Sequence, residues 1–228
     1  DEVIALWSRV LIAVPNSRLF LKCKQLVDMS VRKNLIQRFD KHGINKKRII
    51  LEGPDPREEY FAAYNRVDIA IDPFPFPGGT TSVEGLWMGV PVLTLAGDRC
   101  LSKQGEGILI NAGLPDWIAA NKEEYVVKAL AFASDMDGLA SLRAGLRTQV
   151  LASPLFDTAR FARNFEDALH EMWQRYQEQQ GLKQDNGGNY KIAKTNPSQD
   201  QINALINLYN SGQQTKIEQT CNELLVTC

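Results

Sequence analysis

The sequence predicts an α/β fold built on a doubly wound parallel sheet, followed by a small α-helical hairpin. Segments with helical periodicity alternate with short β-rich runs over the first 180 residues, and such alternation favours parallel strands covered by helices. Residues 68–95 contain a strand, a loop, a helix and a second strand at the spacing of a parallel crossover. The chain of 228 residues is 44% hydrophobic and 23% charged, which suits one globular domain with an appendage.

The N-terminal elements follow from hydrophobic periodicity and from the residues that end helices. Residues 2–13 carry an apolar face of period 3.6 and stop before Pro15, so they are expected to form a helix. The run at 18–23 reads as a strand. Residues 29–42 form a second amphipathic pattern, and Gly43 is expected to end that helix.

The next strand is expected at 48–51, where EGPDP breaks the apolar run, and a short helix is expected at 57–65. Beyond residue 95 the same criteria predict helices at 105–113, 122–134, 137–152 and 158–180, and a short strand at 117–118. The last of these helices has an apolar stripe, on which Trp173 is expected to be a core residue, as is Trp87 in the crossover unit.

The crossover unit reads DIAIDPFPFPGGTTSVEGLWMGVPVLTL, with Asp72 closing its first apolar run. The paired glycines let the backbone approach a ligand closely because they lack a Cβ. Thr80 or Thr81 is expected to cap the following helix, whose first-turn N–H groups have no partner inside it. Free N–H groups at the positive end of a helix favour an anion, most naturally phosphate. A Gly-rich turn before an ordinary capped helix also fits the pattern, with Glu84 as a surface residue or a ligand of a ribose diol.

Three loops follow strands of the predicted sheet, at residues 52–57, 72–81 and 96–99. Ligands of open parallel sheets bind outside the carboxyl ends of the strands. These loops are therefore expected to meet at one crevice. Arg99 in the third loop could face a bound phosphate or, more simply, the solvent.

Composition excludes several classes of function. The net charge of −1 gives no electrostatic case for nucleic acid or an anionic membrane. No apolar stretch reaches the roughly 18 residues of a membrane span, and no signal peptide is visible in a chain that begins at Asp1. The four widely spaced cysteines predict neither a zinc site nor a disulfide framework, so reduced thiols and a cytoplasmic location are expected. Both histidines, His42 and His170, are expected at the surface.

The C-terminal part changes character. Residues 181–197 are rich in Gln, Asn, Gly and Lys and read as a linker, so the first domain is expected to span 1–180. Residues 198–228 have two short apolar faces around a turn, which fits a helical hairpin of tetratricopeptide type. One such unit cannot bury its own apolar face. A loose tail with a marginal hairpin is the alternative.

Four motifs together carry a resemblance to a known family. They are RIILEGPDPREEY at 48–60, NRVDIAID at 65–72, GGTTSVEGLWMGVP at 78–91 and SPLF at 153–156. In combination they resemble the C-terminal catalytic lobe of the O-linked N-acetylglucosamine transferase family, especially its bacterial members and the SPINDLY branch. The likeness covers about residues 1–180. It implies a Rossmann-like C-terminal lobe of a GT-B glycosyltransferase.

The resemblance implies roles for residues of the loop before the 57–65 helix. Asp55 matches the position where the backbone touches the base of the nucleotide. Arg57 matches a basic residue near the diphosphate, although it could also be a surface partner of neighbouring glutamates. Tyr60 stands where the animal enzyme has a histidine that contacts the nucleotide.

The resemblance also implies roles for the GGTT segment. Gly78 and Gly79 belong to the donor-binding loop, with Gly79 in place of a family histidine. Thr80 and Thr81 match the threonine pair that binds the diphosphate. Glu84 matches an aspartate that binds the ribose. The family's glutamine and lysine contacts to the donor lie upstream of the residues that match Asp1.

The implied function is the donor-binding half of an inverting protein O-glycosyltransferase that moves N-acetylglucosamine from UDP-N-acetylglucosamine to Ser or Thr of an acceptor protein. GT-B enzymes stabilise the leaving diphosphate with helix N-termini and basic side chains, so no metal or other cofactor is expected. The formal DxD at Asp135–Asp137 lies between two helices, where Asp is an ordinary cap. The catalytic base is not in the matching segments, and the chain alone is expected to be inactive.

Two other functions remain open at this point. A SPINDLY-type protein O-fucosyltransferase would use GDP-fucose on the same fold. A non-catalytic scaffold would use tetratricopeptide repeats to bind protein partners. A sugar epimerase shares the architecture, but the SPLF turn and the helix after it favour the transferase.

Overall fold

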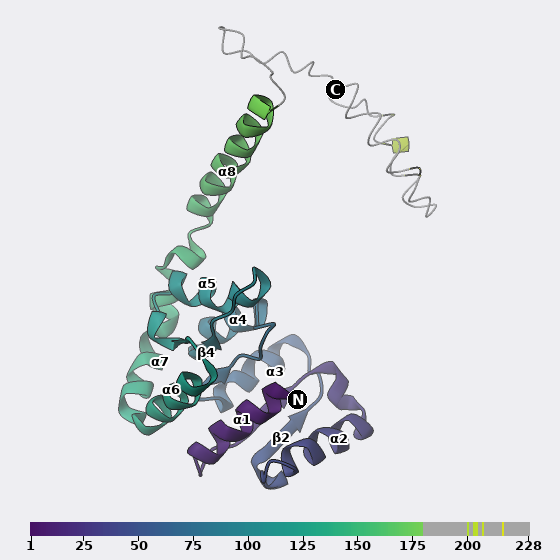
Figure 1. Cartoon of the computed structure of the whole chain (residues 1–228), viewed down its shortest axis with the longest axis vertical. Helices are drawn as coiled ribbons and strands as arrows, with labels where there is room; N and C mark the ends of the chain where they lie inside the picture. Colours follow the sequence, from purple (N-terminus) through teal and green to yellow (C-terminus); the bar gives the residue numbers. More distant parts are fainter. Residues whose placement is uncertain (180–199, 201–202, 205–206, 208–215, 217–228) are drawn as a thin grey trace. The chain divides into compact units, whose positions relative to one another are not determined.

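The computed structural model describes residues 1–179, 200, 203, 204, 207 and 216. The chain divides into two units, Asp1–Phe165 and Glu166–Cys228, and Figure 1 labels the helices and strands. The linker predicted at 181–197 lies outside the described residues, and the hairpin predicted at 198–228 lies almost entirely outside them. The proposed division into domains therefore stays a prediction.

The N-terminal part of the first unit consists of α1 (Glu2–Ala13), β1 (Leu19–Lys22), α2 (Met29–Asp40) and β2 (Ile49–Glu52). The two strands pair in parallel, with Leu19 opposite Ile49. Gly43 has a φ of 77°, which is the left-handed conformation that lets a glycine end a helix. The buried residues of this part are Ile4, Leu11, Leu19, Phe39, Ile44 and Ile49.

The rest of the unit is built on β3 (Ala70–Ile71), β4 (Val92–Leu95) and β5 (Ile118–Ala119), which form one parallel sheet in that order. Its helices are α3 (Arg57–Ala62), α4 (Thr80–Trp87), α5 (Gln104–Asn111), α6 (Lys122–Ser134) and α7 (Met136–Leu151). Leu86, Leu93, Tyr125 and Leu146 are fully buried in the larger core cluster. Trp7 and Ile71 pack against both clusters and so join the two parts.

The fold class is confirmed in part. All described strand pairs are parallel and helices separate successive strands, as predicted. The strands fall into a two-stranded and a three-stranded sheet. A single doubly wound sheet therefore stays a prediction.

The last described helix is α8 (Thr158–Gln179). Its apolar stripe is exposed, at Phe161, Phe165, Leu169, Met172, Trp173 and Tyr176. Trp173 is 46% exposed, so the prediction that it is a core residue was wrong. Periodicity identified the face, but in the described part of the chain no buried cluster includes it.

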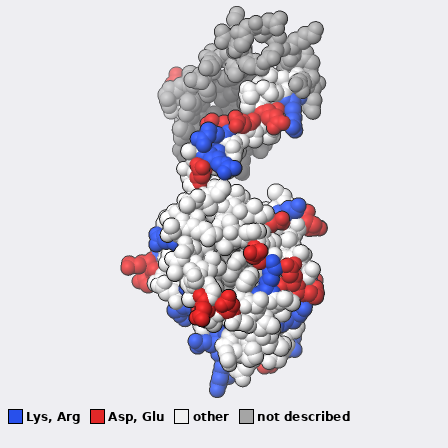
Figure 2. All heavy atoms as spheres, turned by 90° about the vertical axis from the view of Figure 1, so that its left-hand side faces the viewer, with Lys and Arg blue, Asp and Glu red and all other residues white. Residues whose placement is uncertain are grey.

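Charged side chains of both signs are mixed on the face of the first unit that Figure 2 shows. Ion pairs of the unit include Lys128 with Glu124 at 3.2 Å and Arg143 with Asp68 at 3.4 Å. Cys23 and Cys100 are free and exposed, whereas the other two cysteines lie outside the described residues. None of the described helices is long and apolar enough to cross a membrane. Both histidines are exposed, as predicted.

Candidate functional site

The start of α4 carries the glycine and threonine motif. Gly79 is the N-cap residue and no side chain makes a capping hydrogen bond. Thr80 and Thr81 are the first two helical residues, and both are exposed. The prediction that a threonine caps the helix was therefore wrong, because the helix begins one residue earlier than a threonine cap requires. Neither hydroxyl is used by a cap. The Ser82 and Val83 N–H groups donate to the Gly79 carbonyl, whereas the N–H groups of Thr80 and Thr81 have no partner in the described part of the chain and keep their capacity to bind an anion.

The buried carboxylate of Asp72 binds the loop that precedes α4 and the first turn of that helix. Asp72 follows β3 and is 6% exposed. Its Oδ1 accepts hydrogen bonds from the Ser82 hydroxyl at 2.9 Å and from the Gly78 N–H at 3.3 Å. Burial raises the pKa of the Asp72 carboxyl, and the hydrogen bond from Ser82 opposes that rise. A Cβ on Gly78 would lie 2.2 Å from the Ser82 Oγ, so a side chain at this position would disrupt the support.

The start of α5 lies against the same carboxylate. A Cβ on Gly105 would lie 2.2 Å from the Thr94 Oγ1 and 3.0 Å from the Asp72 Oδ2. Both of these oxygens are buried without a hydrogen-bond partner in the described part of the chain. The nearby Thr94 hydroxyl opposes the rise in the pKa of Asp72, but its position relative to the Asp72 carboxylate is not that of a hydrogen bond. Gly79 also lies against Gln104, since a Cβ on this glycine would be 2.4 Å from the Gln104 Nε2. The N-termini of α4 and α5 therefore lie close together, and Figure 1 shows the two helices as neighbours.

Side chains of α3 and of the turn after it also contact α4. The Tyr60 hydroxyl donates to Oε2 of Glu84 at 2.8 Å and lies 3.1 Å from the Tyr64 hydroxyl. Tyr64 donates to the backbone carbonyl of Thr81 at 3.1 Å. Burial raises the pKa of both tyrosines, so both hydroxyls keep their protons at neutral pH. Two residues predicted from the sequence, Tyr60 and Glu84, are thus in direct contact.

The remaining predicted residues lie at the start of α3. Asp55 forms an ion pair with Lys22, whose side chain is only 9% exposed. Arg57 is exposed, and its guanidinium lies 5.3 Å from the centre of the Phe61 ring. Neither of these contacts of Asp55 and Arg57 involves a residue of α4. Arg99 in the third loop is exposed to solvent.

The comparisons with known proteins decide the family. The family model described as "Glycosyl transferase family 41" matches residues 1–165. The chain belongs to glycosyl transferase family 41.

Individual relatives agree with this family assignment. A probable UDP-N-acetylglucosamine–peptide N-acetylglucosaminyltransferase SPINDLY of Solanum lycopersicum is 39% identical over 176 residues, which are 77% of this chain and 19% of the relative. A UDP-N-acetylglucosamine–peptide N-acetylglucosaminyltransferase of Caenorhabditis elegans is 30% identical over 77% of this chain and 15% of its own. The chain thus spans about a fifth or less of these relatives.

A solved structure resembles the fold. A mutant of the Thermobaculum terrenum O-GlcNAc transferase superposes with a TM-score of 0.72 at 37% identity, over 76% of this chain and 33% of its own. This likeness supports a GT-B glycosyltransferase fold for the family 41 chain. The predicted family resemblance is confirmed.

The structure adds residues that sequence reasoning did not assign to the site. Asp72 was noted only as the end of a strand, although a polar residue at the carboxyl end of a buried strand is a useful signal. Tyr64 lies four residues after Tyr60, the spacing at which two helical side chains share a face. Gly105 and Thr94 gave no sequence signal, because their contact joins separate elements.

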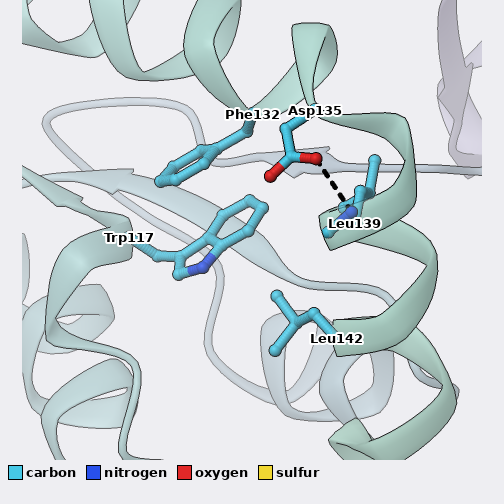
Figure 3. A pocket seen from close by; sticks show the side chains of 6 residues that line it. Trp117, Phe132, Asp135, Leu139 and Leu142 are labelled. Carbon is cyan, nitrogen blue, oxygen red and sulfur yellow. Dashed lines mark hydrogen bonds between the residues drawn. The ribbon is translucent and has the colours of Figure 1, made fainter.

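One hollow of this family 41 chain lies away from these residues. A pocket of about 190 Å³ is lined by Trp117, Phe132, Asp135, Gly138, Leu139 and Leu142, and Figure 3 shows the Trp117 and Phe132 rings facing each other. Asp135, the first residue of the formal DxD, accepts a hydrogen bond from the Gly138 N–H at 2.9 Å and caps α7. None of the residues predicted to bind a sugar nucleotide lines this pocket. Among the described residues, no group of three or more His, Cys, Asp or Glu could hold a metal ion.

Proposed function

We propose that this chain is the donor-binding half of an inverting, metal-independent protein O-glycosyltransferase. The donor is UDP-N-acetylglucosamine, and the acceptor is a Ser or Thr hydroxyl of a protein. The observation that carries the proposal is the start of α4, where two exposed threonines follow an N-cap without a side-chain capping bond. Membership of glycosyl transferase family 41 and the names of the relatives support it.

The arrangement suits a nucleoside diphosphate. The amino end of α4 offers the N–H groups of Thr80 and Thr81, which have no partner among the described residues, together with the hydroxyls of both threonines and the positive end of a helix dipole. Gly78 and Gly79 let the diphosphate approach the backbone. Glu84 lies one turn further along the same helix, where its carboxylate can accept hydrogen bonds from ribose hydroxyls. A diphosphate bound there would be stabilised as it leaves, because fixed donors meet the growing negative charge.

The start of α3 supplies the remaining proposed contacts. Arg57 would add positive charge beside the diphosphate, for which its guanidinium must leave the Phe61 ring. The backbone near Asp55 would touch the base, and the ion pair with Lys22 holds this loop in place. We further propose that the protein is cytoplasmic and that the predicted hairpin at 198–228 binds protein partners.

Thermal unfolding with added nucleotide tests the binding site. UDP at about 100 times its Kd should stabilise the folded chain by roughly 2.7 kcal/mol, which is about 5–11 °C in Tm for a domain of this size. Thr81→Val and Glu84→Ala should each remove most of this shift. Thr158→Val is the matched control, because Thr158, like Thr81, is an exposed threonine in the first turn of a helix. The absence of a shift with UDP would count against the proposal, and a larger shift with GDP would favour a fucosyltransferase.

Transfer itself is tested by mass spectrometry. The protein, in its full natural length, is incubated with a panel of nucleotide sugars and candidate acceptor proteins. A mass increase of one N-acetylhexosamine on Ser or Thr, in the presence of a metal chelator, is the expected result. Transfer that stops when the chelator is added would contradict the metal-independent mechanism.

A further inference from the structure

We propose that Tyr60 and Tyr64 are positioning residues that fix the Glu84 carboxylate for recognition of the ribose hydroxyls. The proposal rests on the proposed function, since it concerns the nucleotide bound at α4. By family resemblance Tyr60 stands at the position of a histidine that contacts the nucleotide, and its own contact with the nucleotide stays a prediction. In the structure its hydroxyl donates to Glu84.

The hydrogen bonds have a defined direction. Each tyrosine hydroxyl has one proton, and the backbone carbonyl of Thr81 has none to offer. Tyr64 therefore donates to the Thr81 carbonyl at 3.1 Å and Tyr60 donates to Glu84 at 2.8 Å. The two hydroxyl oxygens also lie 3.1 Å apart, but both protons are already used in the bonds to Thr81 and Glu84. This network of two hydrogen bonds ties α3 and the turn after it to the backbone of Thr81 and to the side chain of Glu84 on α4.

The network leaves part of the carboxylate free. Tyr60 occupies Oε2 of Glu84, whereas Oε1 has no hydrogen-bond partner in the described part of the chain. A carboxylate can accept about four hydrogen bonds through its two oxygens. Glu84 therefore retains the capacity to accept hydrogen bonds from two hydroxyls, such as those of a ribose, while the bond from Tyr60 fixes its orientation.

Packing keeps the two tyrosines in place. Their rings meet edge to face, with centres 5.7 Å apart and planes at 86°. Tyr60 makes a second such contact with Phe61 at 5.4 Å. Tyr64 lies close to the backbone of α4, because a Cβ on the buried Gly85 would be 3.5 Å from its ring. The hydroxyls are thus presented by rings that have little freedom to move.

A carboxylate fixed before binding costs less to order on binding. A glutamate without such a partner loses side-chain freedom when it captures a ligand, at a cost of about 0.5–1.5 kcal/mol. This cost corresponds to roughly 2- to 12-fold in affinity. Removing the Tyr60 hydroxyl should weaken binding by about this factor, and only for ligands that use the ribose hydroxyls.

The test compares UDP with 2′,3′-dideoxy-UDP, which lacks both ribose hydroxyls, by calorimetric titration of the 228-residue chain. The wild type should bind UDP more tightly than 2′,3′-dideoxy-UDP. Tyr60→Phe should weaken UDP binding roughly 2- to 12-fold with little change for 2′,3′-dideoxy-UDP, so the preference for UDP falls. Tyr64→Phe should lower the preference in the same direction, by less. Tyr176→Phe, which removes the hydroxyl of an exposed tyrosine on α8, should leave both affinities unchanged.

A double-mutant comparison separates positioning from general damage. In a Glu84→Ala background, Tyr60→Phe should cause no further loss of UDP affinity, because the tyrosine acts through the carboxylate. Equal weakening of both nucleotides by Tyr60→Phe, or a further loss in the Glu84→Ala background, would overturn the inference while leaving the proposed function intact. A wild type that binds neither UDP nor GDP would overturn the proposed function, and this inference with it.

Discussion

The contact between α5 and the buried carboxylate predicts that Gly105→Ala is destabilising. A Cβ at this position would lie 2.2 Å from the Thr94 Oγ1, 3.0 Å from the Thr94 Cβ and 3.0 Å from the Asp72 Oδ2. Thr94 is fully buried and Asp72 is 6% exposed, so neither side chain can move aside into solvent. Gly107 on the same helix is the matched control, because it is exposed and a Cβ there would meet nothing within 4 Å.

The magnitude follows from two opposing terms. Replacing a helical glycine by alanine stabilises by about 0.8–1 kcal/mol, and both variants gain a benefit of this kind. Overpacking a core costs about 1–3 kcal/mol, and only Gly105→Ala bears that cost. The difference in the free energy of unfolding between the two variants should therefore be roughly 1–3 kcal/mol. At about 2–4 °C per kcal/mol for a domain of this size, the Tm values should differ by roughly 2–12 °C.

Urea titration and differential scanning calorimetry of the two variants and the wild type measure this difference. Gly107→Ala should be more stable than the wild type, and Gly105→Ala should be less stable than Gly107→Ala. Equal stability of the two variants would refute the reasoning, because it would mean that the space beside Thr94 can accept a methyl group at no cost.

Three other changes test single contacts by urea unfolding. Relative to the wild type, Asp72→Asn should gain stability as pH rises from about 4 to 7. Burial raises the pKa of Asp72 in the folded state, so the wild type loses stability once Asp72 is deprotonated in the unfolded chain. A difference in the free energy of unfolding that does not change with pH would contradict this. Arg48→Ala should cost about 2–4 kcal/mol, since its guanidinium donates to three backbone carbonyls and a hydroxyl at the end of α1, whereas the exposed Lys47→Ala should change stability by less than about 0.5 kcal/mol. Asp135→Ala should cost about 0.5–2 kcal/mol through loss of the α7 cap, and similar effects of Asp135→Ala and Asp137→Ala would refute that assignment.

Local signals in the sequence predicted most element positions. The bounds of α1 (Glu2–Ala13), β4 (Val92–Leu95) and α6 (Lys122–Ser134) match the structure, because a clear apolar period was bounded by residues that stop or cap a helix. Gly43 adopts the positive φ expected of a glycine after a helix. Such features depend on a few neighbouring residues, so one sequence contains enough information to place them.

Contacts between separate elements could not be predicted in the same way. Tyr60 and Glu84 were both predicted as site residues, but no sequence pattern indicated that the two side chains bind each other across 24 residues. The apolar stripe that includes Trp173 was identified correctly as one face of a helix. Whether Trp173 is buried depends on what packs against that face, and in the structure it is exposed. The prediction of a threonine at the N-cap of α4 was wrong, because adjacent small residues compete for that position and Gly79 occupies it.

The close approach of Gly105 to Thr94 has a consequence for how this protein can diverge. The Thr94 hydroxyl occupies the volume that a side chain at position 105 would need. Substitution at one position is therefore conditional on the other: an alanine at 105 requires a smaller neighbour at 94, and such a pair should arise together in descendants of this chain.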